Sequence, residues 1–186
     1  MTLSEYSGKI VGELGRALAA LPDAQGEALA EAILKAEKVF CAGAGRSGFS
    51  VKAFAMRLMH LGYDSYVVGE TVTPNLTAKD IIVFGSGSGS TGSLVVMARK
   101  AKAIGAKIAL ITIADQSPIG ETADIIIRIP APTPKIEKGT DFTSIQPMGS
   151  LFEQSLLLTL DAIILMLMEK SGKDSDTMFT RHANLE

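Results

Sequence analysis

Cysteine is almost absent from this chain of 186 residues, which holds a single one, Cys41, and no tryptophan. A lone cysteine has no partner within the chain, so a disulfide framework of the kind found in small secreted proteins is excluded. Cys41 lies in the apolar run KVFCA, where we expect a small buried hydrophobic residue rather than a nucleophile. A reducing compartment, the cytoplasm, is therefore the expected location.

The sequence also lacks a strong net charge and a long apolar run. Its 18 basic and 20 acidic residues leave a formal net charge of -2, which gives no electrostatic basis for binding nucleic acid or an anionic membrane. No apolar run reaches the roughly 20 residues that span a bilayer, and the start MTLSEYSGKIVGELG lacks the features of a secretion signal. We expect a soluble protein that recognises its ligand through local groups.

Short apolar segments, by contrast, recur at regular intervals. Each is bounded by glycine or by charged residues and is rich in Val and Ile, as is typical of strands buried on both faces. Five such strands are predicted, at residues 38–42, 64–68, 80–84, 106–113 and 124–129.

Helical spacing of apolar residues fills the intervals between these strands. Thr2 and Glu5 have the spacing of a capping box, which predicts that a helix opens the chain. Ser117 and Pro118 have the pattern of an N-cap followed by proline, which predicts a short helix. The predicted helices are an opening helix that ends before Pro22, then residues 23–35, 47–61, 91–104, a short helix from Ser117, and residues 149–170.

Strands that alternate with helices predict the α/β class. We expect a doubly wound, flavodoxin-like sheet of five parallel strands in the order 2-1-3-4-5, with helices on both faces, in one domain over residues 1–186. Residues 1–36 would form N-terminal helices and residues 172–186 a C-terminal tail. Residues 131–146 read as a long loop, and the helix at 149–170 is too apolar to face water on a monomer, which indicates a core position or an oligomer interface.

Two glycine-rich loops follow the first and third predicted strands. In GAGRSG (43–48) and GSGSGSTG (85–92), glycines let the backbone approach a ligand, and the helix start that follows attracts an anion. Because strands 1 and 3 are neighbours in the expected order, both loops would meet at the switch point of the sheet, where we predict a phosphorylated ligand. The candidate ligand-binding residues are Gly43, Gly45, Arg46 and Ser47 in the first loop and Ser86, Ser88, Ser90 and Thr91 in the second.

Other interpretations of these loops stay open. Either loop alone could reflect only a tight turn between a strand and a helix. GAGRSG also satisfies the dinucleotide pattern GxGxxG, and Glu70 lies where a ribose-binding acid belongs, so a nicotinamide oxidoreductase is an alternative. The serine-rich second loop has no part in that fingerprint, however, and it lacks the lysine of a nucleotide-binding P-loop.

Taken together, these motifs resemble the sugar isomerase (SIS) domain family over most of the chain. The resemblance implies a cytoplasmic homotetramer that needs no metal and no organic cofactor. It implies an isomerase that interconverts 3-hexulose 6-phosphate and fructose 6-phosphate, a step of the ribulose monophosphate pathway of formaldehyde handling or pentose supply. The segments that carry the likeness are GAGRSG, FAMRLMHLG (54–62), VVGETVTP (67–74), GSGSGSTG, PMGSLFEQ (147–154) and RHANLE (181–186).

Moving a carbonyl by one carbon needs a base that removes the proton beside it. We predict that Glu153 is this base, because it begins an apolar stripe whose partial burial would raise the pKa of a carboxyl into a useful range. The resemblance supports Glu153 over Gln154, since the corresponding glutamate is the base in related sugar isomerases. The alternative is an ordinary glutamate favoured by the start of a helix. Arg46 could pair with the phosphate or with a carboxylate of the fold.

His182 is the predicted shuttle for protons between hydroxyl and carbonyl oxygens, because its neutral and charged forms are both accessible near pH 7. It lies in a polar tail, which could reach the crevice of a neighbouring subunit. His60 is expected to fill a helix interface. A non-catalytic sugar-phosphate sensor is a further alternative, although no DNA-reading segment is apparent in this sequence.

Overall fold

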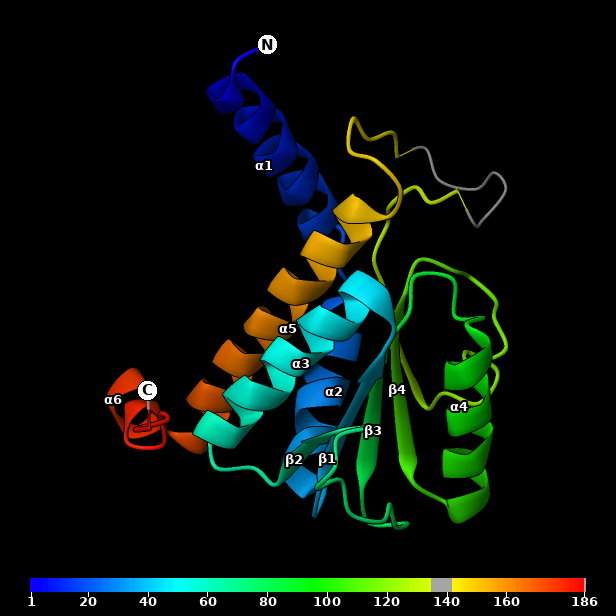
Figure 1. Ribbon diagram of the computed structural model, residues 1–186, viewed down its shortest axis with the longest axis vertical. Coiled ribbons are helices and arrows are strands. Elements are labelled where there is room, and N and C mark those ends of the chain that lie inside the picture. The colour runs from blue at the N-terminus through cyan, green and yellow to red at the C-terminus, as the bar shows by residue number, and fades with distance from the viewer. Residues whose placement is uncertain (135–141, 186) are drawn as a thin grey trace.

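The computed structural model describes residues 1–134 and 142–185. Its described part contains six helices and five strands (Figure 1). The helices are α1 (Leu3–Ala19), α2 (Asp23–Lys35), α3 (Gly45–His60), α4 (Gly92–Ile104), α5 (Ser150–Ser171) and α6 (Ser175–Phe179). The strands are β1 (Val39–Gly43), β2 (Ser65–Val67), β3 (Ile81–Gly85), β4 (Lys107–Thr112) and β5 (Ile125–Arg128).

The five strands form one sheet in the order β2-β1-β3-β4-β5, and every adjacent pair is parallel. This confirms the predicted fold class and strand order. Each predicted strand is present with both ends displaced by one residue, because a run of apolar side chains indicates a strand better than it defines the limits of the strand.

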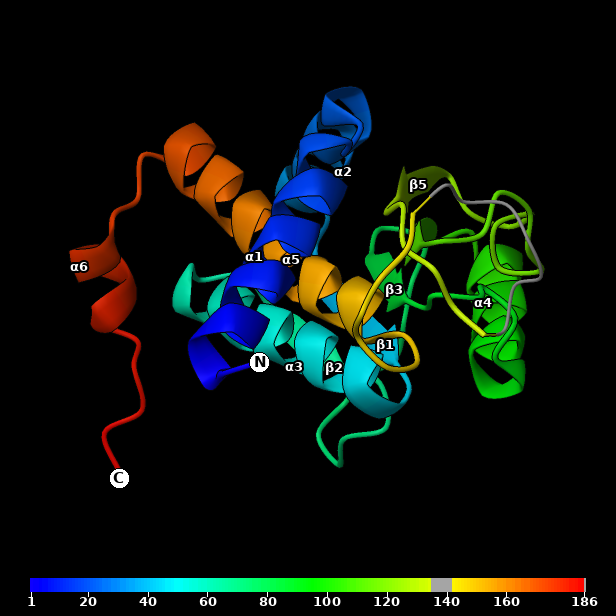
Figure 2. The same ribbon diagram turned by 90° about the horizontal axis from the view of Figure 1, so that it is seen from above.

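Helices cover both faces of the sheet, as predicted. Alternate strand residues face opposite ways, so Val39 and Cys41 join the apolar core beneath α2, α3 and α5, whereas Phe40 and Ala42 join the core beneath α4. Figure 2 shows α4 alone on one side and the other long helices gathered on the opposite side.

The prediction of a short helix from Ser117 is wrong, because residues 118–122 form turns instead. Ser117 Oγ accepts a hydrogen bond from the backbone N–H of Gly120, and Ile119 N–H donates to the carbonyl of Gly89 in the second glycine-rich loop. The serine side chain therefore stabilises a compact turn against that loop rather than a helix start.

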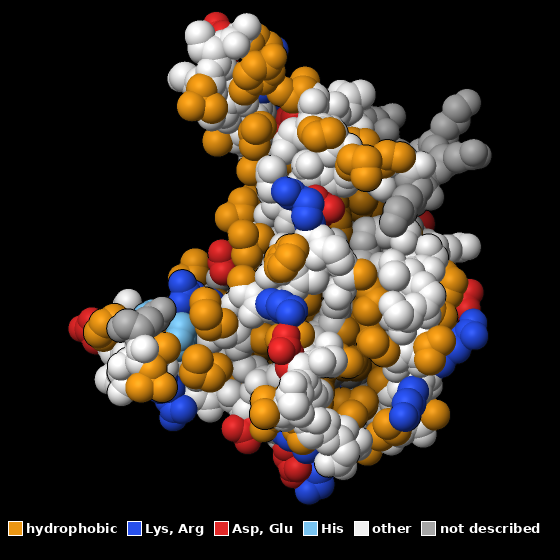
Figure 3. Space-filling view, viewed as in Figure 1, with side chains coloured by type: hydrophobic (Ala, Val, Ile, Leu, Met, Phe, Trp, Pro, Cys, Tyr) orange, Lys and Arg blue, Asp and Glu red, His pale blue; other side chains and the backbone are white. Residues whose placement is uncertain are grey.

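The predicted capping box at the start of α1 is confirmed. Thr2 Oγ1 accepts from the backbone N–H of Glu5, whose carboxylate accepts from the backbone N–H of Thr2. The outer part of α1 projects from the body of the fold and carries exposed apolar side chains, so the surface over this helix is largely apolar (Figure 3). The most exposed of them are Leu3, Tyr6 and Val11.

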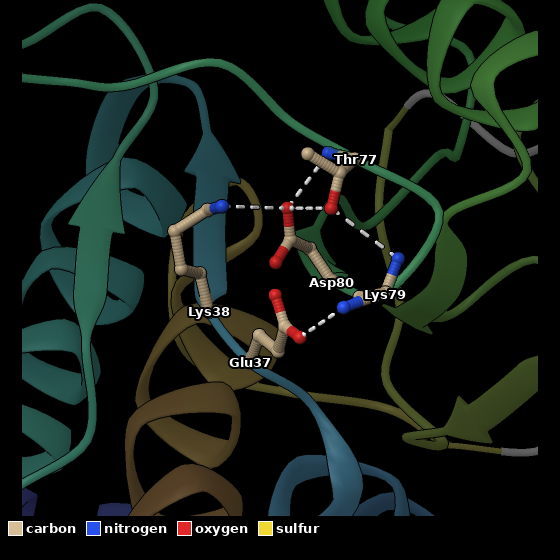
Figure 4. Close-up of polar contacts among 5 residues, drawn as sticks. All are labelled: Glu37, Lys38, Thr77, Lys79 and Asp80. Carbon is tan, nitrogen blue, oxygen red and sulfur yellow. Dashed lines mark hydrogen bonds and ion pairs between the residues drawn. The ribbon is translucent and has the colours of Figure 1, made fainter.

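At the amino ends of the strands, a buried carboxylate fixes the entry of the chain into β3. Asp80 is 1% exposed, and its Oδ2 accepts from the backbone N–H and the hydroxyl of Thr77 at 2.7 and 2.9 Å. Lys38 Nζ lies 3.2 Å from the same oxygen, while the neighbouring Lys79 pairs with Glu37 at the surface (Figure 4). Paired in this way, the Asp80 carboxylate ties the starts of β1 and β3 together.

Helix α5 is long and apolar enough to cross a membrane by length and composition, but half of that stretch is buried inside the fold. Its buried side chains pack on α3 and on the sheet, as in the core helix of a globular protein. Leu158 and Leu165 of α5 remain exposed, as do Phe49 and Met56 of α3. Of the two positions expected for this helix, the core position is therefore confirmed, and an oligomer interface stays a prediction.

The tail after α5 contains the short helix α6 and returns to the far end of α3 (Figure 1). Lys173 Nζ donates to the carbonyl of Leu61 and lies 5.5 Å from the ring centroid of Tyr63. The rings of His60 and His182 stack at 5.5 Å. Of the predicted loop at 131–146, residues 135–141 lie outside the described part of the chain, and the rest contains no helix or strand.

Candidate active site

The two glycine-rich loops meet at the carboxyl ends of β1 and β3, as predicted. The last residues of these strands, Gly43 and Gly85, are direct partners in the parallel ladder. Each strand runs from there through its loop into a helix, α3 or α4. A cavity of about 320 Å³ opens between the loops and the start of α5, a volume typical of small-molecule sites.

Six of the eight predicted ligand-binding residues line this cavity, and so does the predicted base. Residues from the loop after β5 and from the turn before α5 close it from the other side. The predicted residues in the lining are Gly45, Arg46, Ser47, Ser86, Ser88, Thr91 and Glu153; the others include Gly87, Thr133, Pro134, Met148, Gly149 and Phe152.

Gly43 does not line the cavity, and its role is packing. A Cβ atom on Gly43 would lie 3.1 Å from the backbone of Gly48, and one on Gly48 would lie 3.0 Å from the carbonyl oxygen of Gly43. The two glycines therefore let β1 and α3 approach closely. Gly45 lies between them with a φ of 57°, a conformation that favours glycine and turns the chain sharply into the helix.

Ser90 also lies outside the cavity and supports its neighbour. The Ser90 hydroxyl donates to Ser88 Oγ at 3.0 Å, and the backbone N–H of Ser90 points to the same oxygen at 3.3 Å. Ser86 is 4% exposed, and its Oγ accepts from the backbone N–H of Gly89 at 3.2 Å. These contacts fix the shape of the loop and hold the Ser86 and Ser88 hydroxyls at the cavity.

Three helices begin at this cavity. The N-cap residues of α3, α4 and α5 are Ala44, Thr91 and Gly149, and within the described residues no side-chain hydrogen bond caps any of the three starts. The first N–H groups of a helix have no partner inside it and carry partial positive charge. Three such starts around one cavity, with hydroxyls beside them, suit a dianionic phosphate.

The predicted base and the predicted arginine are paired across the cavity rim. Arg46 Nε donates to Glu153 Oε2 at 2.5 Å, which joins the starts of α3 and α5. The Glu153 side chain is 21% exposed and that of Arg46 is 62% exposed, so the carboxylate is half enclosed while the guanidinium faces solvent. Of the two partners proposed for Arg46, the structure shows the carboxylate. Ser50 Oγ donates to the Glu153 carbonyl, which further fixes this turn of α5.

The two histidines lie far from this cavity within one chain. His60 is the last residue of α3, whereas the cavity is at its first turn, and 15 helical steps of 1.5 Å separate these ends by about 22 Å. His182 stacks on His60 and on Phe179. Burial, the charge of Arg57 and the proximity of His182 all lower the pKa of His60. A part for His182 in the site of a neighbouring subunit stays a prediction.

Glu70, the acid that would bind ribose in the dinucleotide interpretation, does not line the cavity. Its carboxylate pairs with Lys52 Nζ at 2.7 Å on the outer side of α3. In residues 1–134 and 142–185, no three histidine, cysteine or acidic side chains come together as metal ligands.

Two segments outside the glycine-rich loops supply cavity residues that sequence reasoning missed. Thr133 and Pro134 belong to the loop after β5, and Met148 and Phe152 belong to PMGSLFEQ, a segment used for the family likeness but not as a source of cavity residues. Met148 has a φ of 58°, which is unusual for a residue other than glycine and marks a sharp turn beside the cavity. Its position after Pro147 and before Gly149 was the available signal.

Known proteins resemble this chain over its whole length. A 3-hexulose-6-phosphate isomerase from Bacillus subtilis is 50% identical over 186 residues, which cover 100% of both chains. A 3-hexulose-6-phosphate isomerase from Methylomonas aminofaciens is 36% identical over 184 residues, which cover 99% of this chain and 100% of the relative.

A solved structure and a family model agree with these relatives. The crystal structure of a hypothetical protein from Methanococcus jannaschii, reported to infer a function of 3-hexulose-6-phosphate isomerase, superimposes with a TM-score of 0.84. It is 33% identical, and the match covers 98% of this chain and 99% of that one. The family model of the SIS domain matches residues 32–158. A family match over more than half of the chain, together with these full-length relatives, means that the chain belongs to the SIS domain family.

Proposed function

We propose that this chain is an isomerase that interconverts 3-hexulose 6-phosphate and fructose 6-phosphate. Its full-length relatives carry the name of that activity. The observation that carries the proposal is the convergence, on one cavity, of three uncapped helix starts, two serine-bearing loops and the carboxylate of Glu153. Isomerisation of a sugar phosphate requires a phosphate-binding site beside a partly enclosed carboxylate that can act as a base.

In the proposed reaction, the cavity holds the phosphate at C6 and presents C2 and C3 to Glu153. The carboxylate of Glu153 removes the proton from C2 of 3-hexulose 6-phosphate, and the electron pair moves to form an enediolate between C2 and C3. Return of a proton to C3 leaves the carbonyl at C2, which is fructose 6-phosphate. A second group must move a proton between the oxygens on C2 and C3, and His182 of a neighbouring subunit is the candidate.

Arg46 and the hydroxyls have different parts in this proposal. Ser47, Ser86, Ser88 and Thr91 bind the phosphate together with the backbone N–H groups of α3 and α4. Arg46 holds the Glu153 carboxylate in one orientation through its 2.5 Å contact. A base held in place before the substrate arrives costs less reorganisation during the reaction.

We also propose that the whole chain acts as one domain in a cytoplasmic homotetramer, in the ribulose monophosphate pathway of formaldehyde handling or pentose supply. Exposed apolar side chains on α1 and on the outer side of α3 and α5 support the assembly, because such surfaces are covered in most soluble proteins (Figure 3). In this proposal an assembly also brings a histidine to the cavity, since in its own chain His60 lies about 22 Å from the first turn of α3 and His182 stacks on His60.

The test is the Glu153→Gln variant, which keeps the size of the side chain and removes the base. We expect turnover of fructose 6-phosphate, followed by NMR without added metal, to fall by a factor of at least about 10². Binding of fructose 6-phosphate, measured by calorimetry, should change little, because the phosphate contacts remain. Glu169→Gln, an exposed glutamate near the other end of α5, is the matched control and should retain full turnover.

Measurements on the Glu153→Gln variant and on the unmodified protein together distinguish the isomerase from the two alternative functions. Full turnover by Glu153→Gln would remove Glu153 from the mechanism. Binding of fructose 6-phosphate by the unmodified protein without any isomer formed would favour the alternative of a non-catalytic sugar-phosphate sensor. Saturable binding of a nicotinamide dinucleotide, with none of a sugar phosphate, would favour the oxidoreductase.

A further inference from the structure

A glutamate outside the cavity is buried and makes hydrogen bonds that the isomerase chemistry does not explain. Glu13 of α1 is 5% exposed, although most of the residues that precede it in this helix are exposed to solvent. Buried carboxylates are rare unless their oxygens are satisfied by donors. Here the donors come from a single short segment more than a hundred residues away in the sequence.

Three consecutive residues of that segment donate to Glu13. Ser144 Oγ donates to Oε2 at 2.6 Å, Ile145 N–H donates to Oε1 at 2.8 Å, and Gln146 Nε2 donates to Oε2 at 3.0 Å. The backbone N–H of Gln146 in turn donates to Ser144 Oγ at 3.0 Å. Both carboxylate oxygens are therefore used to hold one irregular stretch of chain in place.

The ionised form of Glu13 is the one that these contacts favour. Burial by itself raises the pKa of this carboxyl, but the hydrogen bonds from Ser144, Gln146 and Ile145 and the charge of Arg16 outweigh it, so the pKa of Glu13 lies below its ordinary value. Hydrogen bonds to a charged acceptor are stronger than those between neutral groups. The contact is thus a firm attachment between α1 and residues 144–146.

The attached segment leads directly into the cavity. Pro147 follows it, and the carbonyl of Pro147 accepts from the N–H of Ser150 at the first turn of α5. Met148 and Gly149 line the cavity, and the carbonyl of Gly149 accepts from the N–H of Glu153. Only a few residues therefore separate the attachment point from the proposed base.

The other side of the cavity is held independently. The loops after β1 and β3 are fixed by the sheet, by the approach of Gly43 to Gly48 and by the hydrogen bonds of Ser86 and Ser88. None of these contacts involves α1. The position of the turn at Met148 and Gly149 relative to the phosphate loops thus depends on where Glu13 holds the preceding segment.

We propose that Glu13 is a positioning residue for the isomerase site: its carboxylate fixes residues 144–146, and through them the rim at Met148 and the start of the helix that carries Glu153. This inference rests on the proposed function. Loss of the Glu13 carboxylate misplaces the base relative to the bound sugar and leaves the phosphate contacts intact. Misplacement of about 1 Å can cost a factor of about 10² in rate.

The experiment compares Glu13→Gln with the matched control Glu169→Gln, an exposed glutamate of α5. We expect kcat for fructose 6-phosphate to fall by a factor of about 10 to 100 in Glu13→Gln, with KM changed by less than about threefold. The control should keep both constants. Ser144→Ala, which removes one of the three donors, should lower kcat in the same direction by less and should not add fully to Glu13→Gln.

The second measurement needs no turnover. Hydrogen exchange at the backbone N–H of Ile145 should speed up in Glu13→Gln and stay slow in Glu169→Gln, because only the first variant removes the charge of the acceptor group and replaces one of its two oxygens with a donor. An unchanged kcat with faster exchange would overturn the positioning role, and unchanged exchange would overturn the attachment itself. If Glu13→Gln fails to fold, an unchanged kcat in Ser144→Ala would likewise overturn the proposal. An unmodified protein without isomerase activity would instead refute the proposed function.

Discussion

Gly85, the last residue of β3, allows α3 and α5 to lie against the same point of the sheet. It has no side chain, and a Cβ atom at this position would lie 2.7 Å from Cγ1 of Val51 on α3 and 2.9 Å from Cδ2 of Leu156 on α5. Contacts under 3.0 Å are not found for real Cβ atoms, so Gly85→Ala requires one of the helices or its side chain to move. These are the helices that carry Arg46 and Glu153.

The loss of stability in Gly85→Ala depends on which neighbouring side chain can move away from the new methyl group. Leu156 can turn about two bonds, whereas Val51 is branched at Cβ and stiff. Overpacking of this kind costs about 1–3 kcal/mol, and replacing glycine by alanine returns about 0.4–1 kcal/mol through the unfolded state. Gly85→Ala should therefore lower the free energy of unfolding by about 1–2 kcal/mol. Val51→Ala, which removes two buried methyl groups, should lower it by about 2 kcal/mol.

The double variant provides the decisive comparison. Val51→Ala removes the Cγ1 atom that the new methyl group meets, so the double variant should lose at least about 1 kcal/mol less than the sum of the single losses. Gly26→Ala on α2 is the control, because its Cβ would lie 3.8 Å from Ile163, an ordinary contact, and should stabilise the protein by about 0.5–1 kcal/mol.

Urea unfolding followed by circular dichroism measures these changes, since the chain has no tryptophan to report by fluorescence. All variants must be compared at one protomer concentration, because assembly shifts apparent stability. Two results would refute the reasoning: a Gly85→Ala protein as stable as the unmodified one, or a double variant whose loss equals the sum of the two single losses.

Two further predictions concern buried groups. Lys38→Met leaves the Asp80 carboxylate without its cation at a site where the side chain is 0% exposed, so urea unfolding should show a loss of about 2–4 kcal/mol. Lys79 lies on the other side of Asp80 in Figure 4 and pairs with Glu37 at the surface. Lys79→Met should therefore cause little or no loss, and equal effects of the two variants would contradict the argument. Burial raises the pKa of the Cys41 thiol to about 12, so at pH 8 only about one thiol in 10⁴ is ionised. A disulfide reagent should therefore label Cys41 only at the rate of unfolding, and fast labelling of the native protein would show that the thiol is accessible.

Local signals in the sequence predicted the sheet and the two loops because the forces that form them act between neighbours in the chain. The continuous apolar runs of β1 and β3 and the glycines at their ends can be recognised without any knowledge of distant residues. The same reasoning was wrong at Ser117, since its N-cap pattern also suits a turn. The contact of Ile119 with the carbonyl of Gly89 decided between the two.

Contacts between distant residues could not be predicted in this way. The attachment of Glu13 to residues 144–146 spans more than 130 residues and leaves no periodic signal. Met148 and Thr133 line the cavity together with loops that come much earlier in the sequence, and no local pattern indicates that proximity. His60 is separated from the cavity by the length of α3. Both histidines are visible in the sequence, but the sequence alone does not show which end of a helix faces the ligand.

Because Arg46 pairs with Glu153, binding of the phosphate and orientation of the carboxylate can be assigned to different groups of the site. A dianionic phosphate can be balanced by helix starts and hydroxyls, and the cavity supplies three uncapped starts with Ser47, Ser86, Ser88 and Thr91 beside them. The guanidinium is then available to orient a carboxylate, a task for which its fixed donor geometry is well suited. Since this contact joins α3 to α5, its length depends on how closely both helices pack over Gly85. A change at the end of β3 should therefore alter the geometry of the proposed base, Glu153, as well as stability, although position 85 itself carries no functional group.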